Sequence, residues 1–123
     1  MPTDIDSILN STKKSLGIAA EYTYFDTDII IHINSVFSSL ELLGVGPSGD
    51  QFIITGPDET WDEFLGAQKN VNMVKSYIYM RVRLMFDPPQ SGFGLDSLQK
   101  QIDKMEWLMM VATSSTPNVQ AGS

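Results

Sequence analysis

Residues 44–49 (GVGPSG) are the first segment whose residue types and spacing suggest chemistry. They match the G-x-G-x-x-G pattern, which in dinucleotide-binding folds follows a strand and opens a helix whose N-terminus binds pyrophosphate. Here the pattern follows a helical periodicity, Pro47 removes one N–H donor, and the surroundings are acidic. We therefore interpret the segment as a helix end followed by a turn-rich loop, and expect no cofactor.

Carboxylates cluster in residues 58–63 (DETWDE), where four acids fall within six positions. Clustered oxygens are the ligands that calcium prefers, but the spacing is not that of a calcium-binding loop. Thr60 and Glu63 instead match a capping box, in which each side chain satisfies a free N–H at the start of a helix. Acids in the first turn also interact favourably with the helix dipole. We expect a helix start here, and no metal.

The remaining residue types offer little for enzymatic chemistry. The sequence has one histidine and no cysteine, which excludes a thiolate nucleophile, a disulfide and a cysteine-ligated zinc site. His32 lies one position from the apolar face of a predicted helix, where a lone histidine is usually a boundary residue with one hydrogen bond. No G-x-S-x-G, H-E-x-x-H or P-loop motif occurs. We predict that the protein is not an enzyme.

The elements that must position any functional residue fit into one domain. The chain has 123 residues, of which 42% are hydrophobic and 19% charged, a globular composition. Residues 1–10 lack the features of a signal peptide and no apolar run is as long as a membrane span, so we expect cytoplasmic synthesis and no membrane partner. We predict a helical domain over residues 1–112 and a flexible, polar tail over residues 113–123.

Hydrophobic periodicity predicts an all-α fold, a compact bundle of four main helices and one short helix. Apolar residues recur at three- and four-residue steps in the main helices. We expect these helices over residues 6–16, 27–43 and 70–86, with a last one whose apolar seam runs from Leu95 to Met109. The short helix is expected over residues 61–65.

Turn-forming residues mark the ends of these helices. Gly17 and Gly44 are expected as C-terminal stops, and Asp87 followed by two prolines ends the fourth helix. Residues 92–94 (GFG) are expected to form a loop before the last helix. The long loop after Gly44 contains a β-favouring run from Phe52 to Thr55, for which we expect at most a small β element.

Charge is distributed unevenly along the chain. The formal net charge is −7, which opposes non-specific binding to nucleic acid and to anionic membranes. Residues 1–66 carry eleven acidic and two basic side chains, whereas residues 67–123 carry four acidic and six basic ones. This asymmetry is either solvated surface that only maintains solubility or a pair of complementary surfaces for self-assembly.

Several segments together resemble one protein family. In chain order they are residues 16–18 (LGI), 25–35 (FDTDIIIHINS), 43–47 (LGVGP), 61–66 (WDEFLG), 74–89 (VKSYIYMRVRLMFDPP) and 101–107 (QIDKMEW). They resemble the head-to-tail connector proteins of long-tailed DNA phages and prophages, over roughly residues 6–111. None of these segments is catalytic, and residues 79–89 together with 106–107 are the most specific part.

The resemblance implies a structural protein at the head-to-tail interface of the virion, made in the cytoplasm of a bacterial host. It implies a helical adaptor that docks on the portal protein, forms a ring of twelve subunits, and provides the platform for a tail-completion protein or the next connector. Double-stranded DNA would pass through this ring without specific binding, since an acidic lining would let it slide. No cofactor is implied.

A ring needs a heterologous contact, in which one face of a subunit meets a different face of the next. We hypothesise that Lys75, Arg81 and Arg83 of the fourth helix contact an acidic stretch of the neighbouring subunit. Asp58 and Glu59 are the acidic candidates. Arg81 lies beside the apolar arc, and of the three cations it is the one most expected to form an internal salt bridge instead.

The predicted tail supplies the candidate contacts with the portal. In the resembled family an extended C-terminal segment engages the portal, which nominates Thr113, Pro117 and Val119 here. The competing function class is an acidic regulatory or DNA-mimic protein. Such a protein would bind a nucleic-acid-binding protein through its negative half and would stay a monomer or dimer.

Overall fold

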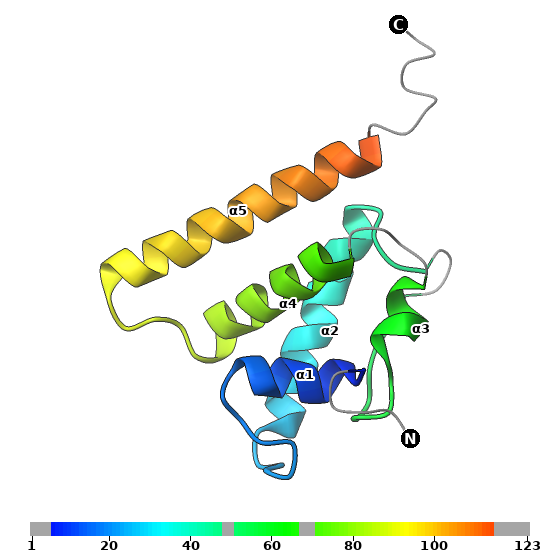
Figure 1. The fold of residues 1–123 in the computed structure, drawn as a ribbon, viewed down its shortest axis with the longest axis vertical. Coiled ribbons are helices and arrows are strands. Elements are labelled where there is room, and N and C mark those ends of the chain that lie inside the picture. The colour runs from blue at the N-terminus through cyan, green and yellow to red at the C-terminus, as the bar shows by residue number, and fades with distance from the viewer. Residues whose placement is uncertain (1–5, 48–50, 67–70, 115–123) are drawn as a thin grey trace, which may run out of the picture.

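Five helices make up most of the described part of the chain. The computed structural model describes residues 6–47, 51–66 and 71–114. The helices are α1 (Ile8–Ser15), α2 (Asp26–Leu42), α3 (Trp61–Leu65), α4 (Val71–Phe86) and α5 (Gly92–Ser114). α2 packs against α4, α1 packs against both, and α5 lies along α4 (Figure 1). Within the described residues the only β pairing is an isolated bridge between Ser7 and Thr60, so the all-α prediction is confirmed.

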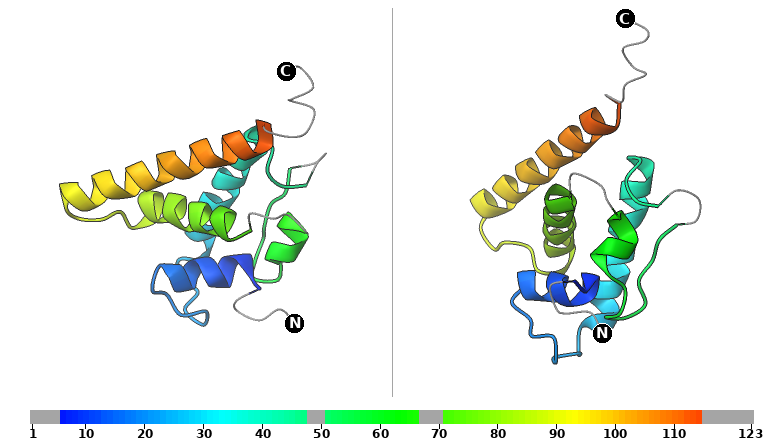
Figure 2. Two further views of the ribbon diagram at one scale, coloured as in Figure 1. Left: turned by 45° about the horizontal axis from the view of Figure 1, so that its top comes forward. Right: turned by 45° about the vertical axis from the view of Figure 1, so that its right-hand side comes forward.

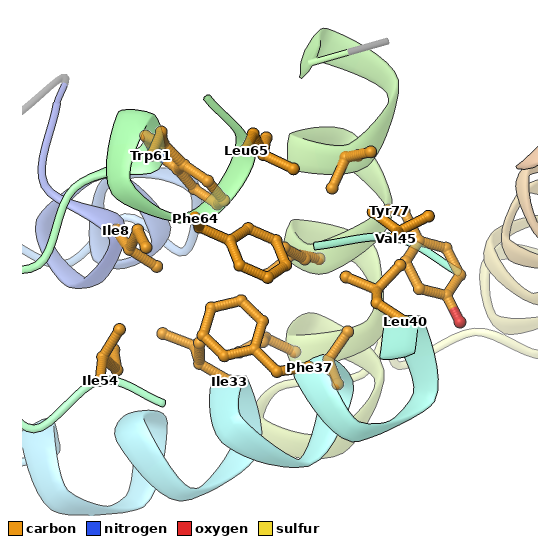
Figure 3. Close-up of a cluster of buried hydrophobic side chains, with 14 of the residues drawn as sticks. Ile8, Ile33, Phe37, Leu40, Val45, Ile54, Trp61, Phe64, Leu65 and Tyr77 are labelled. Carbon is orange, nitrogen blue, oxygen red and sulfur yellow. The ribbon is translucent and has the colours of Figure 1, made fainter. Parts of the chain in front are cut away.

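The core lies between α2 and α4, where the apolar faces predicted by the periodicity meet. Its buried members from these helices are Ile29, Ile33, Val36, Phe37, Leu40, Val74, Tyr77, Ile78 and Val82. α3 covers one end of this core through aromatic packing. The ring centroid of Phe64 is 4.4 Å from that of Phe37 (Figure 3). It is also 5.2 Å from the ring centroid of Phe52.

The glycine pattern after α2 serves the fold. Gly44 has a φ of +82° and follows the last residues of α2, as predicted for a helix stop. Gly46 has a φ of +111°, and a Cβ atom there would lie 2.9 Å from Cε1 of Phe64. Gly44 is therefore required by its backbone conformation. Gly46 is required both by its backbone conformation and by its close packing against the Phe64 ring.

Most helix boundaries agree with the predictions. α2 begins and ends one residue before the predicted positions, and α3 has the predicted bounds. The capping box is present, since Thr60 Oγ1 accepts the Glu63 N–H at 3.1 Å and Glu63 Oε1 accepts the Thr60 N–H at 2.8 Å. Gly17, with a φ of +79°, follows α1, and α4 ends at Phe86, before the two prolines.

One local expectation differs from the structure, and the small β element allowed for the long loop does not form. Residues 92–94 form the first turn of α5 and not a loop, because the Ser91 hydroxyl accepts the Gly94 N–H at 2.9 Å and caps the helix start. The run from Phe52 to Thr55 forms no strand. The Asn34 side chain takes the place of a strand partner, accepting from Ile54 N at 2.8 Å and donating to Ile54 O at 3.0 Å.

A buried lysine joins α1 to the start of α2. The Lys13 side chain is 0% exposed, and its Nζ donates to Ala20 O at 2.9 Å and lies 2.8 Å from Asp26 Oδ1. Ala20 belongs to the loop over residues 16–25, and Asp26 is the first residue of α2. A buried charge is tolerated only with such partners. Lys13 therefore fixes the path of this loop, a role that no local sequence pattern indicates.

Replacing Lys13 is expected to destabilise the fold strongly. Lys13→Met leaves Asp26 and the Ala20 carbonyl without their partner, so we expect a loss of about 3 kcal/mol in the free energy of unfolding. The matched control is Lys14→Met, at an exposed neighbouring position, with a change within about 0.5 kcal/mol. Urea denaturation measures both. Equal losses in the two variants would contradict the role of Lys13.

Candidate assembly surfaces

The predicted basic residues of α4 have three different surroundings. Lys75 is half-buried, with its Nζ 5.5 Å from the ring centroid of Trp61, a cation–π contact within the subunit. Arg81 Nη1 lies 3.5 Å from Glu106 Oε2 of α5 and also donates a hydrogen bond to the Tyr77 hydroxyl. Arg83 is exposed. The expectation that Arg81 forms an internal salt bridge is confirmed, and Arg83 is the most accessible of the three cations.

Tyr77 is the centre of a polar link between α4 and α5. Its hydroxyl donates to Glu106 Oε2 at 2.7 Å and accepts from Arg81. Burial, together with the hydrogen bond to Glu106, raises the pKa of Tyr77 to about 12, and the Arg81 charge opposes part of this shift. This link sits beside the apolar contacts that α5 makes with the core through Leu98, Ile102 and Met109.

The two predicted acidic residues also differ in their surroundings. Glu59 accepts hydrogen bonds from the Thr55 N–H at 3.1 Å, the Thr55 hydroxyl at 2.9 Å and the Gly56 N–H at 3.3 Å. Partial burial alone would raise the pKa of Glu59, but these hydrogen bonds outweigh it and lower the pKa below its ordinary value. Asp58 is exposed. Glu59 thus closes a turn of its own chain, whereas Asp58 faces solvent.

The predicted portal contacts lie at or beyond the end of the described chain. Thr113 belongs to the last turn of α5, which ends at Ser114. Pro117 and Val119 lie outside the described residues. The predicted boundary at residue 112 therefore falls just inside the C-terminal end of a helix.

The described residues offer no assembled site for metal chemistry. Within residues 6–47, 51–66 and 71–114, no group of three His, Cys, Asp or Glu side chains could hold a metal ion. His32 is half-buried, with its ring 6.3 Å from that of Phe86, consistent with a boundary position. No helix in this part of the chain is long and apolar enough to cross a membrane.

Exposed apolar side chains are the surface feature that sequence reasoning missed. The large ones are Tyr22, Tyr24, Ile31, Leu42, Ile53, Met85, Phe93, Leu95, Trp107, Met110 and Val111. Helical periodicity places apolar residues on the inward faces of helices, so the residues predicted for the contact between subunits were all charged. A usable signal was present, because Phe93 and Trp107 lie off the seam that runs from Leu95 to Met109.

Comparison with known proteins agrees with a helical structural module. The family model described as phage connector protein matches residues 8–116. The chain therefore belongs to the phage connector protein family and has the structural role of a phage connector. No curated protein and no solved structure matches the chain.

The polar link at Tyr77 predicts a specific loss of stability at alkaline pH. The pKa of Tyr77 is raised from about 10 in the unfolded chain to about 12 in the fold. The contribution of the neutral Tyr77 hydroxyl to the stability of the fold is therefore complete below pH about 10 and is lost as the pH rises toward 12. Urea denaturation between pH 8 and 11.5 is expected to show a steeper alkaline decline for the natural chain than for Tyr77→Phe. The same decline in both proteins would contradict the link.

Charge reversal separates the structural cation of α4 from the accessible one. Arg81→Glu places a second carboxylate beside Glu106, so we expect a loss of roughly 1–2 kcal/mol in the free energy of unfolding. Arg83 is exposed, so Arg83→Glu is expected to change the free energy of unfolding by less than about 0.5 kcal/mol. Thermal or urea denaturation measures both, and a larger loss for Arg83→Glu would contradict the assignment. Assembly defects in Arg83→Glu then report on an interface, and those in Arg81→Glu report on the fold.

Proposed function

We propose that this phage connector docks on the portal ring at the head-to-tail interface of the virion. There it forms a ring of twelve subunits around the DNA channel and provides the platform for a tail-completion protein or the next connector. The observation that carries the proposal is the match of the connector family model to residues 8–116.

Two features of the surface support an assembling protein. Large apolar side chains are exposed on both the loop over residues 16–25 and on α5, and such groups on a small domain are typical of surfaces that bind other proteins. The net charge of −7 suits a ring through which DNA slides, because attraction to each phosphate would slow its passage.

The contacts of this ring and of the portal are part of the proposal. Of the five charged residues predicted for the contact between subunits, Arg83 and Asp58 are exposed, whereas Lys75, Arg81 and Glu59 have partners within the subunit. The contact with the portal is made by the C-terminal segment over residues 113–123.

Affinity capture from phage-producing cells tests the proposed function. The tagged chain is expected to retain the portal protein and a tail-completion protein, identified by mass spectrometry, with a subunit ratio of one to one for two twelve-membered rings. The matched control lacks residues 115–123 and is expected to lose the portal while keeping the fold of α5. Capture of a basic DNA-binding protein without any capsid component would contradict the proposal and support the DNA-mimic class.

A further inference from the structure

The outward face of α5 carries an unusual combination of side chains. Phe93, Lys100 and Trp107 follow one another at seven-residue intervals, which places them on one face of the helix, and Lys104 lies one turn after Lys100. Phe93 is 87% exposed and Trp107 is 60% exposed, and both lysines are exposed. These four residues are called the α5 outer face below.

This face contains a hollow, and its lysine charges can pair with groups on another molecule. A shallow hollow of about 320 Å³ is lined by Phe93, Asp96, Ser97, Lys100, Gln101 and Lys104. The ion pair between Lys100 and Asp96, at 3.1 Å, joins neighbouring turns of the same helix and is exposed on both sides. An exposed pair of this kind contributes little to stability, so Lys100 can exchange it for a partner on another molecule.

Exposed aromatic and acidic residues follow one another through the end of the loop before α2 and the first turn of α2. Tyr24 is 77% exposed and Tyr22 is 52% exposed, with their ring centroids 6.3 Å apart. Glu21 and Asp28, both exposed, flank the two rings in the sequence. These four residues are called the loop patch below.

The loop patch is held in place by the fold. The Tyr24 ring packs at 4.9 Å from that of Phe25, and Phe25 packs at 5.2 Å from Phe86 of α4. Beneath the same loop, Lys13 donates to the Ala20 carbonyl. A surface that is already ordered loses little conformational entropy on binding, which favours its use as a docking site.

The two surfaces lie on opposite sides of the subunit. In each view of Figures 1 and 2, α5 lies on one side of the molecule and the loop before α2 lies on the other, with α4 between them. They therefore cannot meet within one chain. Two different complementary faces on opposite sides of a subunit form a heterologous contact, which closes into a ring when the rotation between subunits allows it.

We propose that the α5 outer face of one subunit binds the loop patch of the next subunit. This inference rests on the proposed function, because it names the contact that would build the connector ring. Lys100 and Lys104 meet the carboxylates of Glu21 and Asp28, and the exposed rings of Phe93 and Trp107 pack with Tyr22 and Tyr24. The occupant of the α5 outer face is thus a second copy of this chain.

Charge complementarity favours a second copy over DNA. In residues 1–66 the two basic side chains are Lys13, which is buried in an ion pair, and Lys14, so the surface of this half is strongly acidic. The α5 outer face has two lysines beside Asp96 on a chain of net charge −7, too little positive charge to hold a phosphate backbone. Aromatic groups on both surfaces further suit a contact between proteins.

Site-specific crosslinking tests the contact directly, because the chain has no cysteine of its own. Ser97→Cys places a thiol in the hollow and Thr23→Cys places one between the two tyrosines, with little change of shape. In connectors assembled on portal-bearing particles, the double variant treated with a short bismaleimide is expected to give a ladder of covalent oligomers. Each single variant is expected to stay monomeric.

The control and the contradicting outcomes are distinct. The matched control combines Ser97→Cys with Asp58→Cys. The proposal would be overturned if this control gave the ladder of oligomers and the variant with Ser97→Cys and Thr23→Cys did not. A crosslink from Ser97→Cys to the portal or to DNA-bound protein would also overturn the proposal. The same holds if rings assemble but the double variant gives no covalent oligomers. Absence of multimers on portal-bearing particles would overturn both this inference and the proposed function.

Charge exchange supplies an independent measurement of the same contact. Lys100→Glu with Lys104→Glu is expected to lower the yield of rings at least about tenfold, since like charges then face each other. Adding Glu21→Lys with Asp28→Lys in the same chain is expected to restore the yield. Gln99→Glu, which adds negative charge to α5 away from this face, is expected to have little effect. A loss that the second pair does not restore would overturn the proposed pairing.

Discussion

The packing of α2 against α4 is the constraint on which the rest of the structure depends. Both helices bury a continuous apolar face, and the other helices attach to one or both of them: α1 to both, and α5 mainly to α4. Because α5 and the loop that joins α1 to α2 lie on different sides of this pair, the surfaces that they carry face different directions (Figure 2). A subunit built this way has two unlike ends, as a ring-forming protein requires.

Polar interactions fix how the loop before α2 and helix α5 attach to this apolar core. Lys13 holds the loop before α2, and the hydrogen bonds of Tyr77 with Arg81 and Glu106 hold α5 against α4. Each involves a charge that is partly or fully removed from water, so losing one partner costs more than the pair itself contributes. Arg83, Lys100 and Lys104 lie outside these contacts and are exposed.

The sequence predicted the elements better than the surfaces, for physical reasons. The apolar period of α2, the capping box of α3 and the prolines after α4 are local signals, and the structure agrees with each of them. The burial of Lys13 depends on Ala20 and Asp26 reaching it, and the pairing of Asn34 with Ile54 joins residues twenty positions apart. Such contacts are tertiary, so periodicity and capping rules do not detect them. For the same reason Lys75 and Glu59 were predicted as interface residues, although each has a partner within its own subunit.

The central claim is that the connector forms a portal-bound ring, and a cryo-electron microscopy reconstruction of the portal vertex tests it most directly. Particles assembled with this chain are predicted to show a ring of helical density on the portal, into which copies of α1 to α5 fit with α5 of each subunit against the next subunit. A portal vertex without this ring, in particles that contain the chain, would contradict the account.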